Sequence, residues 1–131
     1  MAQVFEEPNE ELGDAYLQRL LERDDFWVLA ALDGDDVLGG ISAHALPMTR
    51  SESTELFIYD LAVRTDRQRQ GIGRTLVTAL RVAACDAGVE VCFVPADDED
   101  THALDFYRAL GGNPAEVTIF DWSGPPSDGS L

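Results

Sequence analysis

Two glycines and several arginines crowd one short segment of the chain, between an apolar run and a helical pattern. The run at residues 56–63 predicts a strand, and the residues after Gly73 begin a helix at once. A helix N-terminus is partly positive and leaves N–H groups without partners, so it stabilises an anion. Glycine at positions 71 and 73 lets the backbone come close to that anion. In a chain of formal net charge -16, this pattern favours a phosphorylated cofactor over a solvated turn. The arginines are Arg64, Arg67, Arg69 and Arg74.

Two common phosphate-binding motifs are excluded by the residues around the glycines. A P-loop needs a lysine after its second glycine, and the chain contains no lysine. A dinucleotide fingerprint needs a third glycine where this chain has Leu76. A nucleoside triphosphatase and a dinucleotide-binding enzyme are therefore both disfavoured.

Length and composition predict one domain, and the strand-helix-strand unit within it predicts an α/β class. The 131 residues are 45% hydrophobic, which is enough for a single core but not for two. We assign the domain to residues 1–122, and we expect the Gly/Pro/Ser-rich residues 123–131 to be a disordered tail. No apolar run is long enough to cross a membrane, and no cleavable leader is evident, so a cytoplasmic location is expected. Neither nucleic acid nor membrane is expected as a partner of this acidic chain.

The two cysteines lie in apolar patterns. Cys85 and Cys92 are too few for a disulfide framework or a metal site, so we expect two buried free thiols and no metal.

Periodicity and turn residues predict the order of the elements. The strand at 89–94 is expected to be buried on both faces and parallel to the strand at 56–63, because a helix connects the two. Expected helices cover residues 12–23, 73–88 and 101–110, and expected strands cover residues 26–32, 37–46, 56–63, 89–94 and 117–122.

The spacing Gln68-x-x-Gly71-x-Gly73, five residues after a strand, resembles the acetyl-coenzyme A signature of the GNAT (GCN5-related N-acetyltransferase) superfamily. The resemblance implies that backbone N–H groups from Gln68 to Thr75 hold the pyrophosphate, and that the end of the preceding strand pairs with the thioester and pantetheine. The cofactor-binding residues implied are Leu61, Ala62, Val63, Gln68, Arg69, Gln70, Gly71, Ile72, Gly73, Arg74, Thr75 and Tyr107.

The same resemblance implies an α+β fold with a mixed central sheet, in which two parallel strands splay apart between flanking helices. Pro95, directly after the second of these strands, lacks a backbone donor and helps to keep the sheet open there. Residues 1–11 are too few to supply the first strand and first helix of the superfamily, so these elements are expected to be reduced or missing. A partner subunit would cover the sheet edge left open, which favours a homodimer.

A tyrosine in the last predicted helix is the candidate general acid. The superfamily places a tyrosine from an aromatic-Tyr-x-x-x-Gly sequence beside the coenzyme A sulfur, and Phe106-Tyr107 followed by Gly111 matches that pattern. A phenol with a pKa near 10 can protonate a leaving thiolate whose thiol has a pKa near 8.5. The alternative is a tyrosine that packs the helix against the sheet.

Carboxylates gather at the expected mouth of the splayed strands. Glu55 and Asp60 lie in the cofactor strand, and Asp97, Asp98, Glu99 and Asp100 follow the second strand. A solvated loop would explain the acidic run equally well. We expect Glu55, Asp60, Asp97, Asp98 and Asp100 to bind a small cationic amine.

A narrower resemblance is to the aminoglycoside 3-N-acetyltransferases of gentamicin-resistance type. It is carried by residues 55–63, by residues 93–97 and by the tyrosine helix, and Pro95, Asp98 and His44 depart from that family's pattern. It implies that an acceptor amine attacks acetyl-coenzyme A directly, while the Leu61 N–H polarises the carbonyl, a donor worth ~3 kcal/mol.

The base that takes the ammonium proton stays open at this point. The candidates are Asp60, Asp97 and Asp100, with His44 and His102 as chemical alternatives. Two further functions also stay open: acetylation of another polyamine or a protein amine, and acyl-coenzyme A binding without catalysis.

Overall fold

The computed structural model describes residues 12–126. The chain divides after Ala96 into two compact units, residues 1–96 and 97–131. The expectations for the N-terminal strand and helix rest on residues 1–11, and most of the expected tail is residues 127–131; both lie outside the described residues.

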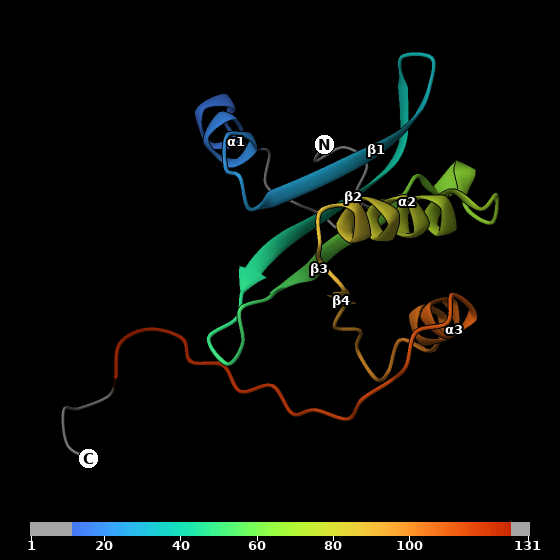
Figure 1. Ribbon diagram of the computed structural model, residues 1–131. Coiled ribbons are helices and arrows are strands. Elements are labelled where there is room, and N and C mark those ends of the chain that lie inside the picture. Colours follow the sequence, from blue (N-terminus) through green and yellow to red (C-terminus); the bar gives the residue numbers. More distant parts are fainter. Residues whose placement is uncertain (1–11, 127–131) are drawn as a thin grey trace. The chain divides into compact units, whose positions relative to one another are not determined.

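The first unit is built on a four-stranded mixed sheet in the order β1-β2-β3-β4 (Figure 1). Its strands are β1 (Phe26–Asp33), β2 (Asp36–Pro47), β3 (Thr54–Val63) and β4 (Val91–Phe93). β1, β2 and β3 are antiparallel neighbours, and β4 is parallel to β3. Gly34, in the turn between β1 and β2, has φ 61°, a conformation that glycine adopts without a steric penalty.

A β-bulge interrupts β3 at Tyr59. Ser42 of β2 pairs with Asp60, whereas the next residue, Ala43, pairs with Ile58, so Tyr59 is the extra residue. The bulge keeps Ile58 and Leu61 on one face of the sheet and places Tyr59 and Asp60 together on the other. The apolar residues of this strand stand at positions 56, 58, 61 and 63, so their spacing changes from two residues to three at the bulge. The change is visible in the sequence, but a search for strict alternation misses it.

Helix α2 (Ile72–Asp86) supplies the core of the first unit by packing on β1, β2 and β3. Its buried residues Leu76, Val77, Leu80 and Ala84 recur at helical spacing and face one side of the sheet. They meet Ile41 and Ala43 of β2 and Leu56 and Ile58 of β3, all of which are almost fully buried. Helix α1 (Asp14–Leu21), ahead of β1, buries none of its residues.

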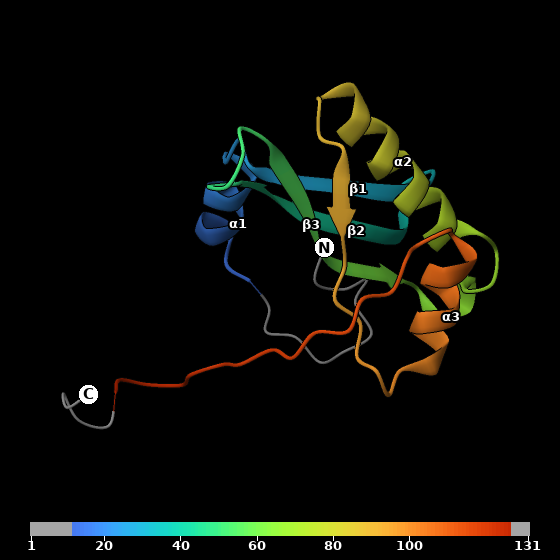
Figure 2. The ribbon, with the colours of Figure 1, turned by 60° about the horizontal axis from the view of Figure 1, so that its bottom comes forward.

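The parallel pair separates as expected. Only three residue pairs join β3 to β4, from Glu55↔Val91 to Phe57↔Phe93, although β3 continues to Val63 (Figure 2). The expectation that residues 89–94 are buried on both faces was wrong, because β4 is a short edge strand. The side chains of Val91 and Phe93 are 50% and 39% exposed.

The expectation for the thiols was also wrong for Cys85, which is exposed, while Cys92 is partly buried. Cys85 follows the buried Ala84 by one position, and one residue turns a helix by about 100°, which moves the side chain off the buried stripe. Burial raises the pKa of the Cys92 thiol. No group of three or more potential metal ligands occurs within residues 12–126.

The second unit contains α3 (Thr101–Ala109), close to the expected residues 101–110. Asp100 caps this helix by accepting a hydrogen bond from the Ala103 N–H at 3.0 Å. The strand expected at residues 117–122 was wrong: no helix or strand follows α3 up to residue 126. The apolar residues of this segment are 71–86% exposed. An alternating segment becomes a strand only when a neighbouring strand pairs with it.

No helix in the described part of the chain is long and apolar enough to cross a membrane.

Candidate functional site

The segment between β3 and α2 forms a loop that ends in an uncapped helix N-terminus. The Arg64 N–H donates to the Leu38 carbonyl at 2.8 Å, a 3-10 turn follows at Thr65–Arg67, and α2 begins at Ile72. Arg69 and Gly71 have positive φ, 66° and 80°. No side chain caps α2, and its first turn carries no acidic residue. The partly positive end of a fifteen-residue helix is therefore left to an anion.

The backbone at Gly71 faces open space. A Cβ at this position would meet no heavy atom within 4 Å. An anion can therefore reach the peptide groups at the start of α2 directly, which a side chain at position 71 would hinder.

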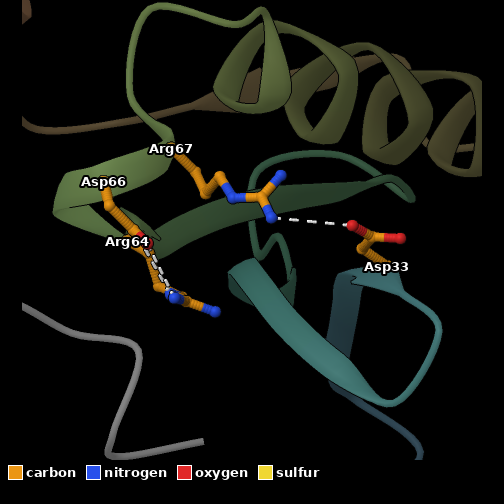
Figure 3. A network of polar contacts seen from close by, with 4 residues as sticks. All are labelled: Asp33, Arg64, Asp66 and Arg67. Atoms are coloured by element: carbon orange, nitrogen blue, oxygen red, sulfur yellow. Dashed lines mark hydrogen bonds and ion pairs between the residues drawn. The ribbon is translucent and has the colours of Figure 1, made fainter.

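The arginines of this segment fall into two pairs with different surroundings. Arg64 holds Asp66 through two hydrogen bonds of 2.8 and 3.1 Å, and Arg67 pairs with Asp33 at 3.6 Å (Figure 3). Arg69 and Arg74 are exposed and form no ion pair with any residue in the described range 12–126. These two guanidinium groups are the ones available to a phosphate.

Two side chains of the glycine motif stabilise the loop rather than point to a ligand. The Gln68 amide Nε2 donates to the Val63 carbonyl at 3.2 Å, which ties the loop to the end of β3. The Thr75 hydroxyl donates to the Gly71 carbonyl at 2.8 Å, within the first turn of α2. The motif therefore fixes the backbone of the loop and of the start of α2.

The end of β3 next to this loop is paired on one side only. Leu61 and Val63 pair with Ile41 and Gly39 of β2, but they lie beyond the last pair between β3 and β4. No strand within the described residues flanks the other edge of β3 from Ile58 to Val63. That edge can accept an extended ligand by strand-like hydrogen bonds.

The expected acceptor carboxylates of the first unit share one face of the sheet. Glu55 precedes Leu56, whose side chain faces α2, so Glu55 faces away from the helix; the bulge turns Asp60 to the same side. Asp60 is exposed, and Glu55 is partly buried.

Aromatic rings form a row across that same face, which sequence reasoning missed. Phe26, His44, Phe57 and Phe93 occupy one register row through all four strands. Ring centroids lie 5.2 Å apart for Phe26–His44 and 5.0 Å apart for Phe57–Phe93, and Tyr59 lies 5.7 Å from both His44 and Phe57. The imidazole of His44 is thus packed among rings. The sequence signal for this aromatic row was the pair of aromatic residues at positions 57 and 59, two residues apart in one strand.

The second unit carries Tyr107 and the acidic run. Burial, and to a lesser extent the nearby Asp100 carboxylate, raise the pKa of the Tyr107 phenol. Its ring lies 5.1 Å from that of Phe106, edge to face. At neutral pH the phenol carries its proton, as a tyrosine of ordinary pKa also does.

Two carboxylates of the acidic run serve the local fold. The Asp97 carboxylate accepts the Glu99 N–H at 3.1 Å, and Asp100 caps α3. Asp98 is exposed. These contacts favour a turn-forming role for Asp97 and Asp100 alongside the substrate-binding role predicted for them.

The loop, the freed strand edge and the helix start agree with the family found by comparison. Residues 2–111 match the acetyltransferase (GNAT) family. The chain belongs to this family. The comparison with curated proteins found no match.

Solved structures of the family include aminoglycoside acetyltransferases similar to this chain. HMB0005, from an uncultured soil metagenomic sample, is 38% identical over 88% of this chain and 77% of its own, with a TM-score of 0.82. Meta-AAC0020, also from an uncultured soil metagenomic sample and in complex with sisomicin, is 38% identical over 95% of this chain and 83% of its own, with a TM-score of 0.87. AAC(6')-Iy, in complex with a bisubstrate analogue, shares the fold at 19% identity over 94% and 86% of the two chains, with a TM-score of 0.77.

The comparisons confirm the GNAT membership expected from the glycine motif and the mixed sheet with a splayed parallel pair. The protein is a GNAT acetyltransferase whose similar structures include aminoglycoside acetyltransferases.

Proposed function

We propose that the protein transfers an acetyl group from acetyl-coenzyme A to an amine of an aminoglycoside, at the 3-N position. The observation that carries the proposal is the one-sided end of β3, at Leu61–Val63, directly before a loop with an open glycine and an uncapped helix start. Support for the acceptor comes from aminoglycoside acetyltransferases that are 38–39% identical to this chain, one of them in complex with sisomicin.

The cofactor is held by backbone and by two arginines. The N–H groups from Gln68 to Arg74 hold the pyrophosphate, helped by the guanidinium groups of Arg69 and Arg74, whereas the Thr75 N–H donates to the Gly71 carbonyl at 3.0 Å. The edge of β3 at residues 61–63 pairs with the pantetheine arm, and the Leu61 N–H polarises the acetyl carbonyl. Acetyl-coenzyme A supplies an activated acetyl group on a thiol leaving group.

The acceptor is recognised by carboxylates on the open sheet face. Glu55 and Asp60 attract the ammonium groups of the acceptor. The same carboxylates favour the charged form of the acceptor amine, which cannot attack a carbonyl. The Asp97 carboxylate accepts the Glu99 N–H at 3.1 Å and the Asp100 carboxylate accepts the Ala103 N–H at 3.0 Å, so both serve the local fold of the acidic run. Asp60 is exposed to water and directly precedes Leu61, whose N–H is assigned to the acetyl carbonyl. We therefore place the proton acceptor at Asp60, acting directly or through one water.

Tyr107 donates the proton to the departing thiolate. Its phenol carries a proton at neutral pH, and this proton moves to the sulfur as charge develops there. Burial, the larger cause of the raised pKa of this phenol, is also what strengthens a hydrogen bond to a developing anion.

The experiment is a coenzyme A release assay with acetyl-coenzyme A and three acceptors: sisomicin, spermidine and a peptide with a free N-terminal amine. We expect turnover with sisomicin at the highest kcat/KM, and an NMR spectrum of the product that places the acetyl group on the 3-amine. Preference for spermidine or the peptide would overturn the acceptor. Tight acetyl-coenzyme A binding without turnover of any amine would show a non-catalytic binding protein.

A homodimer is part of the proposal as well. Sedimentation equilibrium at micromolar concentration should give twice the chain mass of 14.3 kDa, and a monomer mass would contradict it.

A further inference from the structure

An ion pair joins the glycine loop to a distant turn of the first unit. Arg67, at the end of the 3-10 turn, places its guanidinium 3.6 Å from the carboxylate of Asp33, the last residue of β1 (Figure 3). The ion pairs Arg23–Asp25, Arg64–Asp66 and Arg108–Asp105 each join residues two or three positions apart. Arg67–Asp33 instead connects elements that are far apart in the sequence.

The loop that this ion pair holds has an unfavourable backbone. Arg69 has a positive φ of 66°, which is uncommon for a residue other than glycine, and Gly71 follows two residues later with φ 80°. Such a conformation persists only where the surroundings fix it. Arg64 bonds to the Leu38 carbonyl and Gln68 bonds to the Val63 carbonyl, so these contacts fix the loop to β2 and β3. Arg67 adds a contact to the turn between β1 and β2.

The same ion pair decides which charges face a phosphate. The Asp33 carboxylate would repel an anion at the loop if its charge were not offset by Arg67. Arg67 in turn is held by Asp33, whereas Arg69 and Arg74 form no ion pair within residues 12–126. The four arginines therefore have two functions: those paired with aspartates shape the loop, and the other two meet the ligand.

We propose that Asp33 is a positioning residue for cofactor binding, which acts through Arg67 by holding the glycine loop in its anion-binding conformation. This inference rests on the proposed function, since the anion is taken to be the phosphates of coenzyme A. Arg67 is accordingly a part of the loop's support and not a phosphate ligand.

The expected effect is modest because the ion pair is exposed. The side chains of Arg67 and Asp33 are 35% and 63% exposed, and pairs of this kind change an equilibrium by about two- to five-fold. Salt screens such a pair, so the effect should shrink as ionic strength rises.

The test measures the Kd of coenzyme A by isothermal titration calorimetry at low salt. Asp33→Asn and the double variant should each raise Kd about two- to five-fold, because each removes the ion pair. Arg67→Gln should raise Kd by at least as much, because it also leaves the Asp33 carboxylate unpaired near the anion. In turnover, the KM for acetyl-coenzyme A should rise while kcat stays unchanged. The matched control is Asp35→Asn, in the same turn but without an ion pair to a described residue, and it should leave Kd unchanged.

Two results would overturn the inference. If Arg67→Gln weakens binding while Asp33→Asn leaves it unchanged or tightens it, Arg67 contacts the phosphate directly. If Asp33→Asn and Asp35→Asn weaken binding equally, the effect comes from a general change in the β1–β2 turn and not from the ion pair with Arg67.

A second measurement does not depend on coenzyme A. Amide hydrogen exchange of residues 64–74 in the free protein should be faster in Asp33→Asn than in the wild type or in Asp35→Asn. Equal exchange in Asp33→Asn and the wild type would refute the positioning role. Failure of the wild-type protein to bind coenzyme A would instead refute the proposed function, and the two outcomes are measured separately.

Discussion

Gly71→Ala should separate cofactor binding from stability. Gly71 has φ 80°, and a Cβ there would meet no heavy atom within 4 Å. The added methyl group therefore does not clash with the protein, and its cost to folding is that of the left-handed backbone. It does, however, occupy the space through which a phosphate reaches the start of α2.

The two effects differ in size. Alanine in a left-handed conformation costs about 1–2 kcal/mol, partly offset by the lower entropy of the unfolded chain, so the net loss is about 1 kcal/mol. For a chain of 131 residues this lowers Tm by about 4 °C. Loss of one hydrogen bond to a charged group, about 2 kcal/mol, weakens coenzyme A binding about 30-fold.

Gly88→Ala is the matched control for this variant. Gly88 lies just beyond the other end of α2, with φ 84°, and a Cβ added there would likewise meet no heavy atom within 4 Å. Thermal unfolding should show the same loss of Tm in both variants, while calorimetry should show weaker coenzyme A binding in Gly71→Ala alone. Unchanged binding by Gly71→Ala would refute the pyrophosphate site. Equal weakening in both variants would show that general strain is responsible.

Three further variants test the site and the sheet. Tyr107→Phe should lower kcat about 100-fold with little change in the KM of acetyl-coenzyme A. The control Tyr16→Phe, on the exposed side of α1, should have no effect. Full activity of Tyr107→Phe would show that Tyr107 is not the general acid. Asp100→Asn keeps the cap of α3 but removes a charge, so the pKa of Tyr107 should fall toward 10 while burial keeps it above that value, as read from phenolate absorbance. Because the pKa of Tyr107 is raised in the folded state, its contribution to the free energy of unfolding is present below pH 10 and is lost as pH rises further. Asp100→Asn should reduce this loss. An unshifted phenolate titration in this variant would contradict the effect assigned to Asp100. Gly39→Ala would place a Cβ 2.8 Å from the Ala62 carbonyl oxygen, so urea unfolding should show that the free energy of unfolding falls by about 1–3 kcal/mol. An unchanged midpoint would show that the β3 backbone shifts to make room for the methyl group.

The features that could be predicted from sequence are those determined by local patterns. The strand, glycine loop and helix around Gly71 follow from residue types within a short window, and the end of that helix follows from Gly88. The order of the first four strands and of the three helices was predicted for the same reason, and the family comparison supports the splayed pair.

The features that could not be predicted depend on contacts between distant residues. Alternation at 117–122 is a local signal, but a strand also needs an edge to pair with, which no local window reveals. The ion pair between Arg67 and Asp33 exists because the fold brings the β1–β2 turn next to the loop. Four arginines in one segment gave no indication that two of them are already paired with aspartates.

The bulge at Tyr59 has a consequence for chain length. The ladder between β3 and β4 stops at Phe57, two residues before the extra residue, and a bulge bends its strand and increases its twist. Deletion of Tyr59 would leave Asp60 and Leu61 on their present faces, yet it would straighten β3 and draw its end about 3.3 Å back toward Glu55. A straight β3 could extend its pairing with β4 as far as Val94, before Pro95 ends the ladder, and part of the open edge of β3 would be lost. A single extra residue, together with Pro95, thus helps to leave the end of β3 paired on one side only.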